Sequence, residues 1–93
     1  EEIDLLLERH PEILEVCVFG MPDDISGERV AAAIVRKDRS TVTSKELATW
    51  MKDLIKAEAI PESWFFLDEI PKTDRGKINR DNVRTVCVQQ GAV

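Results

Sequence analysis

Apolar and polar positions along this chain form patterns that predict helices and strands in turn. Residues 1–10 place apolar side chains and a histidine at spacings of three and four, with acidic residues in the first turn. This pattern is typical of an amphipathic helix. Residues 13–20 are rich in β-branched and apolar side chains and predict a strand. Residues 29–36 hold six consecutive apolar positions, as in a strand that is covered on both faces. Between the two strands, residues 20–28 contain two Gly, one Pro and two Asp, and predict a loop.

The second half of the chain predicts two more helices around a third strand. Thr43 and Glu46 form a capping-box pattern, which starts a helix that we expect to run to about Ala57 or Glu58. Residues 63–70 predict the third strand, and a last helix is expected to start at Asn79 or Asp81. The apolar side chains that face the core from these two helices are Leu47, Trp50, Met51, Leu54, Ile55, Val83, Val86 and Cys87.

The order of these elements, α-β-β-α-β-α, predicts an α+β fold for residues 1–93 as a single domain. We expect a small sheet of about three strands, a hairpin and three flanking helices. Ninety-three residues are enough for one modest hydrophobic core. Because the first residue is Glu1 and not Met, we also expect this chain to be a piece of a longer protein.

Charge is distributed unevenly over the chain. The net charge is −5, yet residues 70–93 carry five basic against two acidic side chains, whereas residues 1–69 carry eight against sixteen. An acidic body argues against broad binding to nucleic acid or to an anionic membrane, while the basic segment suits one anionic ligand. No apolar run is long enough for a membrane span, and we expect a cytoplasmic location.

The candidate metal-ligating residues form no recognisable metal motif. Cys17 and Cys87 both lie in apolar stretches without a CxxC or Cys/His spacing, so we expect two reduced, buried thiols. Asp23 and Asp24 are adjacent acids without further ligand spacing, and we predict no metal site. The single histidine, His10, stands before a proline at the end of the first predicted helix and suits a helix-end role.

Residues 70–80, IPKTDRGKINR, gather four cations around a Pro and a Gly, and three interpretations compete for them. A hairpin turn would need Gly76 at positive φ and would leave the cations solvated. A phosphate loop of the GxxxxGK[ST] type is excluded, because Ile78 follows the Gly-Lys pair and Pro71 stands where the first Gly belongs. A third possibility is that Lys77 is displayed on a tight turn toward an anion bound elsewhere.

The same segment resembles the C-terminal signature of the adenylate-forming ligases, the superfamily of acyl-CoA synthetases, nonribosomal-peptide adenylation domains and firefly luciferase. That signature has Pro-Lys-Thr, two variable residues, Gly-Lys-Ile/Val, one further residue and Arg. The positions that match it are Pro71, Lys72, Thr73, Gly76, Lys77, Ile78 and Arg80. Residues 1–24, 26–35 and 64–71 are similar to three further stretches of the family, in the same order.

The resemblance implies the small, mobile C-terminal domain of such an enzyme, without the hinge and the large N-terminal domain that holds most of the ATP and acid sites. The family joins a carboxylic acid to ATP, with Mg²⁺, and releases pyrophosphate. The domain then rotates, and the thiol of CoA or of a carrier protein's phosphopantetheine displaces AMP. The partners implied are therefore the large domain, the acid, and CoA or a carrier protein, and the domain alone is expected to be inactive.

Individual site residues follow from the matched positions. Lys77 corresponds to the lysine that catalyses adenylate formation, and Gly76 and Lys72 lie on the ATP and adenylate side. An ammonium suits this step because it screens the repulsion between the carboxylate and the α-phosphate and stabilises charge in the transition state. For Lys72 and Arg80, solvation or pairing with a nearby acid is the simpler interpretation; the candidate acids are Asp68, Glu69 and Asp81. Arg75 occupies a variable position and is expected on the surface.

A second set of site residues belongs to the thioester step. The resemblance implies that the loop with Gly20, Gly27 and Glu28 faces the active site during that step. The chain departs from the family at residues 57–61, AEAIP, where many relatives carry an aromatic or basic residue and some contact the CoA nucleotide. A Glu there is poor for binding phosphates, which favours a carrier-protein thiol over CoA as the acceptor. The function we expect is an acyl- or aryl-CoA ligase, and the alternatives are an adenylation domain that loads a carrier protein and a non-catalytic interaction module.

Overall fold

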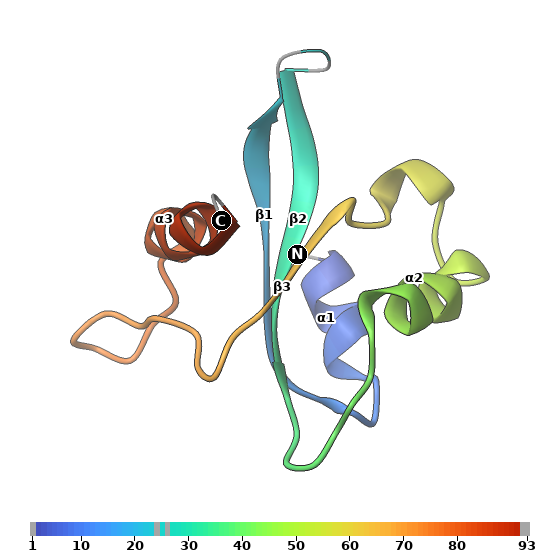
Figure 1. Ribbon diagram of the computed structural model, residues 1–93, viewed down its shortest axis with the longest axis horizontal. Coiled ribbons are helices and arrows are strands. Elements are labelled where there is room, and N and C mark those ends of the chain that lie inside the picture. Colours follow the sequence, from blue (N-terminus) through green and yellow to red (C-terminus); the bar gives the residue numbers. More distant parts are fainter. Residues whose placement is uncertain (1, 24, 26, 92–93) are drawn as a thin grey trace.

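Three strands form one sheet, and different helices cover its two faces (Figure 1). The computed structural model describes residues 2–23, 25 and 27–91. The elements, in chain order, are α1 (Glu2–Glu8), β1 (Ile13–Asp23), β2 (Gly27–Arg36), α2 (Ser44–Lys52), the 3-10 helix η1 (Ala57–Ala59), β3 (Ser63–Phe66) and α3 (Arg80–Gly91). This arrangement confirms the predicted α+β class and the predicted order of the elements.

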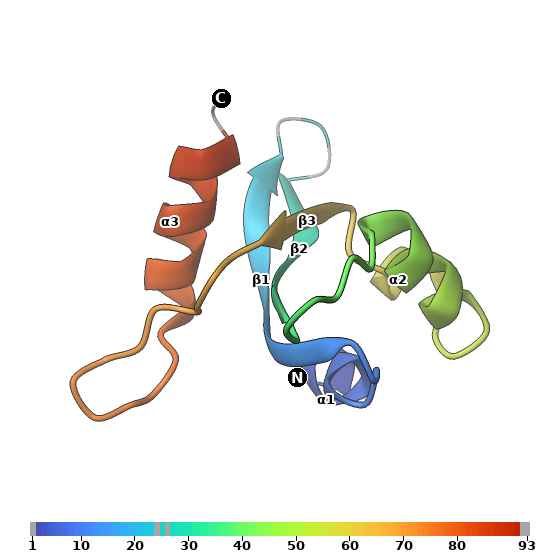
Figure 2. The same ribbon diagram turned by 60° about the horizontal axis from the view of Figure 1, so that its bottom comes forward.

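The strands lie in the order β1-β2-β3, with β2 in the middle. β1 and β2 pair antiparallel as a long hairpin, whereas β3 runs parallel to β2. The chain reaches β3 through α2 and η1, a crossover of the kind that a parallel pair requires. Figure 2 shows α2 and this crossover on the side of the sheet opposite α3.

Side chains of successive strand residues point alternately into two hydrophobic cores. Ala32 and Ile34 of β2 face one core, which also holds Leu7 of α1 and Met51 of α2. The intervening residues of β2 face the second core together with buried side chains of α3 and of the segment after β3. The buried members of that second core are Cys17, Phe19, Ala31, Ala33, Val35, Leu67, Ile70, Val83 and Cys87. β2 is therefore covered on both faces, as its apolar run predicts.

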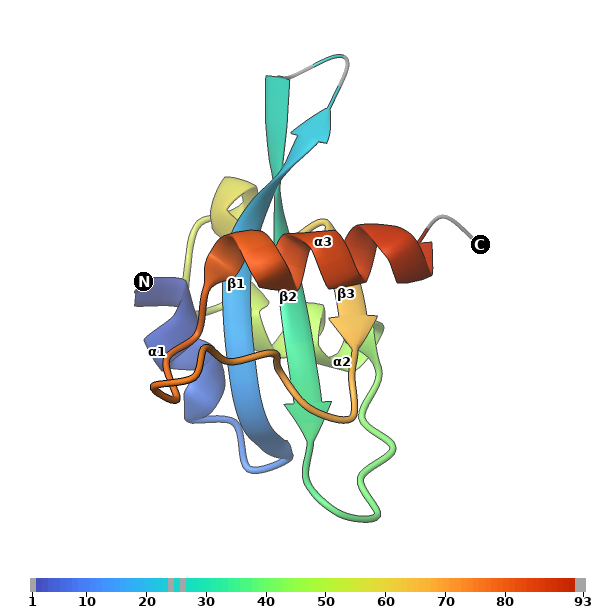
Figure 3. The same cartoon turned by 90° about the vertical axis from the view of Figure 1, so that its left-hand side faces the viewer.

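α3 crosses the second face of the sheet at a steep angle to the strands (Figure 3). Val83 and Cys87, one helical turn apart, are fully buried beneath it, and Val86 packs against the same core. The three side chains predicted to face inward from the last helix all belong to this core. The basic segment between β3 and α3 lies on this side of the sheet too.

The predicted loop over residues 20–28 is wrong for most of its length. β1 continues through Asp23 and pairs with β2 from Gly27 onward, so that Gly20 lies opposite Val30 and Pro22 opposite Glu28. Pro22 is tolerated because β1 is an edge strand and needs bonding on one side only. Gly27 adopts φ +87° where β2 begins, which is the conformation that a glycine permits. Of residues 24 to 26, only Ile25 is described.

Two other predicted boundaries extend too far. α2 begins with the predicted capping box, since the Glu46 amide donates to Thr43 Oγ1 at 3.2 Å and the Thr43 amide donates to Glu46 Oε1 at 3.1 Å. The helix ends at Lys52, however, and the side chain of Leu54 is 51% exposed instead of facing the core. The chain must turn there to bring β3 beside β2, where the Glu62 amide donates to the Val30 carbonyl. β3 ends at Phe66 and not at residue 70.

Candidate functional site

The predicted hairpin turn around Gly76 is present and tightly closed. Lys72 and Ile78 form an isolated antiparallel bridge at its base. Inside it, the Thr73 amide donates to the Lys77 carbonyl at 2.7 Å, and the Lys77 amide donates to Thr73 Oγ1 at 3.2 Å. Gly76 has φ +79°, so the positive φ that the hairpin interpretation requires is observed. Both backbone polar groups of Lys77 are thus bonded within the turn, whereas its side chain is exposed.

The side chain of Lys72 braces the turn against the sheet. Its Nζ lies 2.6 Å from Oε1 of Glu15 on β1 and 3.3 Å from the carbonyl oxygen of Ile70, a fully buried residue. The partner is therefore Glu15, and the predicted pairing with Asp68, Glu69 or Asp81 is wrong for Lys72. A sequence pattern offers no local signal for this contact, because 57 residues separate the two side chains.

Two arginines of α3 attach the helix to the open edge of β1. Arg80 donates from Nη1 to the carbonyl oxygen of Val18, and its Nη2 lies 3.2 Å from Oδ2 of Asp4 on α1. Arg84 donates from Nε to the carbonyl oxygen of Gly20 at 2.8 Å. Residues two apart on a strand direct their carbonyls to the same side, so both arginines bond the edge that β2 leaves open. Asp4 is a partner of Arg80 that the sequence did not suggest.

Lys77 and Arg75 differ from these tethered cations. Both side chains are exposed, and within the described part of the chain neither makes an ion pair or a side-chain hydrogen bond. Figure 1 shows their turn projecting from the molecule below α3. An ammonium presented in this way on a closed turn can approach an anion held on another domain or molecule, without first breaking an internal ion pair.

The second predicted set of site residues lies away from this turn, along the β1–β2 hairpin. Gly20 and Glu28 line a hollow of about 370 Å³, which Arg29 and Arg80 also border. Gly20 leaves room for its neighbour, because a Cβ there would stand 2.3 Å from Oε2 of Glu28. Gly27 does not line this hollow and lies at the far end of the hairpin. The structure therefore groups Lys72, Gly76 and Lys77 in one place and Gly20 with Glu28 in another.

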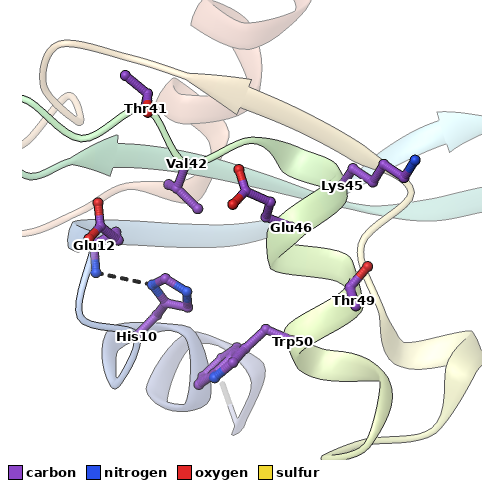
Figure 4. Close-up of a pocket in the computed structure, with 8 residues that line it drawn as sticks. All are labelled: His10, Glu12, Thr41, Val42, Lys45, Glu46, Thr49 and Trp50. Carbon is purple, nitrogen blue, oxygen red and sulfur yellow. Dashed lines mark hydrogen bonds between the residues drawn. The ribbon is translucent and has the colours of Figure 1, made fainter.

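A second hollow, of about 690 Å³, lies between α2 and the segment that follows α1 (Figure 4). His10 accepts a hydrogen bond from the Glu12 amide on its Nδ1 at 3.0 Å and contacts the Trp50 ring edge to face, with centroids 4.9 Å apart. These contacts agree with the predicted helix-end role of His10. None of the side chains of the basic turn borders this hollow.

The two cysteines are buried and reduced, as predicted. Burial raises the pKa of the Cys87 thiol to about 11, and the nearby Cys17 adds to that rise. Burial also raises the pKa of Cys17, against the opposing effect of the Arg80 guanidinium. Both thiols are therefore protonated near neutral pH and are poor nucleophiles.

In the described ranges, no helix is both long enough and apolar enough to cross a membrane. The same residues contain no cluster of three His, Cys, Asp or Glu side chains suited to a metal ion.

Residues 2–77 match the family described as AMP-binding enzyme C-terminal domain, a match that reaches Lys77 itself. The chain belongs to this family. The recognition of the adenylate-forming superfamily from the PKTDRGKINR signature is confirmed.

Known relatives of this AMP-binding enzyme domain are much longer than the chain. The oxalate–CoA ligase of Saccharomyces cerevisiae is 42% identical over 79 residues, covering 85% of this chain and 14% of the relative. The mitochondrial malonate–CoA ligase of Bos taurus is 36% identical over 84 residues, covering 89% of this chain and 14% of the relative. The amide bond synthetase McbA from Marinactinospora thermotolerans has the same fold, with a TM-score of 0.86 and 32% identity over 91% of this chain and 17% of that structure. The chain spans about one seventh of the curated relatives it matches.

Proposed function

We propose that this chain is the mobile C-terminal domain of an ATP-dependent acid–CoA ligase, and that Lys77 acts in the formation of the acyl-adenylate. The observation that carries the proposal is the state of Lys77, whose backbone is fixed in a closed turn while its ammonium is exposed and without an ion pair in the described chain. Membership of the AMP-binding enzyme family and the CoA ligases among the relatives support it.

The chemistry explains why a free ammonium is useful. A carboxylate oxygen attacks the α-phosphorus of ATP, the bond from that phosphorus to the bridging oxygen breaks, and pyrophosphate leaves. Two anions must meet in this step, and charge builds on the α-phosphate oxygens. Lys77 would lie between them as a compact cation with three donors. ATP and Mg²⁺ would be held mainly by the large N-terminal domain, and Gly76 lets the turn approach them closely.

The two separate groups of site residues suit two successive half-reactions. In the second, the acceptor sulfur attacks the acyl carbonyl, AMP leaves with the bonding electrons of the acyl–oxygen bond, and the thiol proton passes to solvent. A rotated domain would present Gly20 and Glu28 to this step instead of the Lys77 turn. CoA is the acceptor we propose, because the oxalate and malonate relatives are named as CoA ligases. A carrier-protein thiol is the alternative, since Glu58 in η1 offers no positive charge to the phosphates of CoA.

The test is ATP–pyrophosphate exchange by the full-length enzyme, with oxalate and malonate as the first acids of a panel. Lys77→Ala is compared with Arg75→Ala, which removes an exposed cation from the same turn. We expect Lys77→Ala to lower the exchange rate by about 10²–10³-fold, the usual effect of losing one transition-state contact, and Arg75→Ala to change it less than twofold. Equal exchange rates for Lys77→Ala and the unaltered enzyme would overturn the proposed role.

The second half-reaction provides an internal control and identifies the acceptor. Preformed acyl-adenylate is supplied to each variant together with CoA or with a carrier protein bearing phosphopantetheine. Thioester formation by Lys77→Ala should stay within about threefold of the unaltered enzyme, because the lysine is not needed once the adenylate exists. Formation of the thioester on CoA supports a CoA ligase, and transfer to the carrier protein alone would replace that part of the proposal.

A further inference from the structure

We propose that Glu15, on β1, is a positioning residue for Lys77 and acts through Lys72 at the base of the turn. This inference rests on the proposed function of Lys77. No similarity to the family signature points to Glu15, which lies 57 positions before Lys72 in the sequence.

The connection from Glu15 to Lys77 is short and continuous. Oε1 of Glu15 lies 2.6 Å from Nζ of Lys72, and the backbone of Lys72 is bridged to that of Ile78, the residue next to Lys77. Glu15 is itself held in β1, where it is paired with Val35 of the central strand. The ion pair between the Glu15 carboxylate and Lys72 therefore fixes the base of the turn relative to the sheet.

A second contact fixes the position of Lys77 within the turn. The hydroxyl of Thr73 accepts from the Lys77 amide at 3.2 Å, and the Thr73 amide donates to the Lys77 carbonyl at 2.7 Å. Thr73 holds the lysine against the opposite side of the hairpin, and the Glu15–Lys72 pair holds the hairpin against the sheet. With the Thr73 contacts alone, the hairpin could still move relative to the sheet. With the Glu15–Lys72 pair alone, Lys77 could still move within the hairpin.

The exposure of the pair favours positioning over stability as its role. The side chains of Lys72 and Glu15 are 37% and 33% exposed, and ion pairs at such sites add little to the stability of a fold. Placement of a catalytic charge is more demanding, because a shift of about 1 Å in a reacting group can cost up to about 10²-fold in rate. A contact that matters little for folding can therefore matter for the position of Lys77.

The experiment combines Glu15→Gln with Lys77→Ala in the full-length enzyme. Glu15→Gln removes the charge and keeps the size, and Glu12→Gln is the matched control, because Glu12 is exposed and its side chain has no ion pair in the described chain. We expect Glu15→Gln to lower kcat for ATP–pyrophosphate exchange about 3–5-fold with the KM for ATP little changed, and Glu12→Gln to have no effect.

The decisive measurement is the exchange rate of Glu15→Gln in the Lys77→Ala background. If Glu15 acts only by placing that ammonium, Glu15→Gln should lower the residual exchange rate no further once the ammonium is gone. Radiolabelled pyrophosphate makes that residual rate measurable. An unchanged rate for Glu15→Gln in the unaltered enzyme, or the same fold-loss in both backgrounds, would overturn the inference. An equal loss in exchange and in thioester formation from preformed adenylate would also overturn it, because it would indicate general damage to the domain.

Two further variants separate positioning from folding. Thr73→Val should lower kcat about 10-fold by removing one hydrogen-bond acceptor, and Thr73→Ser should restore it. Failure of the proposed function has a different result, since Lys77→Ala would then leave exchange unchanged whatever residue stands at position 15.

Discussion

Arg84 on α3 donates a hydrogen bond from its Nε to the carbonyl oxygen of Gly20 on β1, at 2.8 Å. Arg80, one helical turn earlier, donates from its Nη1 to the carbonyl oxygen of Val18. An edge strand with free carbonyls is a template for pairing with another chain, and these two side chains cover part of that edge. α3 is thus attached to the sheet by its buried face and by two cations at its flank.

Replacing Arg84 should weaken this attachment. Arg84→Met keeps the apolar stem and removes the donors, and it should lower the free energy of unfolding by about 1–2 kcal/mol because the Gly20 carbonyl loses its partner. Urea denaturation measures this change, and light scattering at increasing protein concentration should detect more self-association. Lys45→Met, at an exposed position on α2, is the control and should change the free energy of unfolding by less than about 0.5 kcal/mol.

Gly20 and Glu28 should be coupled energetically. A Cβ at position 20 would lie 2.3 Å from Oε2 and 2.9 Å from Cγ of Glu28, so Gly20→Ala requires that side chain to move. We expect Gly20→Ala to destabilise the domain by about 1–2 kcal/mol in the native background and by less than half as much in a Glu28→Ala background. A double-mutant cycle by urea denaturation gives both values, and equal costs in the two backgrounds would contradict the clash.

The stability of the turn should depend on the backbone conformation of Gly76 more than on the space around that residue. Gly76 has φ +79°, and a Cβ there would meet no atom within 4 Å. Gly76→Ala should therefore destabilise through backbone strain alone, by about 1 kcal/mol. Gly76→Asn should cost less, because Asn tolerates positive φ better than Ala does. Thermal unfolding compares the two variants, and an Asn variant as unstable as the Ala variant would argue against this cause.

Stability should fall at alkaline pH because of the buried thiols. The pKa of Cys87 is about 11 in the folded domain, above the ordinary value of 9.0, so the folded state keeps its proton where the unfolded chain loses it. The stabilising contribution of the Cys87 thiol is complete below pH 9, falls as the pH rises from 9 to 11, and is lost above 11. It amounts to about 3 kcal/mol. The pKa of Cys17 is raised as well, so this thiol affects the stability in the same direction.

Urea denaturation across pH 8 to 11 measures this dependence. The free energy of unfolding should fall more steeply with pH for the native sequence than for Cys87→Ala, whatever the absolute stability of that variant. Identical pH slopes for the two proteins would show that Cys87 does not cause the loss.

Features with a local cause were predictable from the sequence. The capping box needs only Thr43 and Glu46, three residues apart, and its two hydrogen bonds are present. The apolar run of β2 predicts a strand covered on both faces, and both cores lie against it. The positive φ of Gly76 follows from the turn chemistry of the residues beside it.

Features that depend on distant residues were not predictable. Lys72 pairs with Glu15 and not with an acid close in sequence, because the fold brings β1 beneath the turn. The extension of β1 through Asp23 depends on pairing with β2, which makes strand residues of Pro22 and Asp23 despite their turn-like composition. α2 ends at Lys52 because the chain must reach β3, although its apolar periodicity continues through Leu54 and Ile55.

The sequence separations of the tethers bear on how the domain folds. The side-chain contacts that tether the base of the Lys77 turn and α3 to the rest of the domain join residues 57 to 76 positions apart, whereas the β1–β2 hairpin forms between neighbours in the chain. Contacts of high separation close late, since the entropy of the intervening loop must be lost first. The hairpin and the helices near it can thus form before the C-terminal segment docks on β1. Lys77 would acquire its fixed position among the last events of folding, and only after the sheet that supports it is complete.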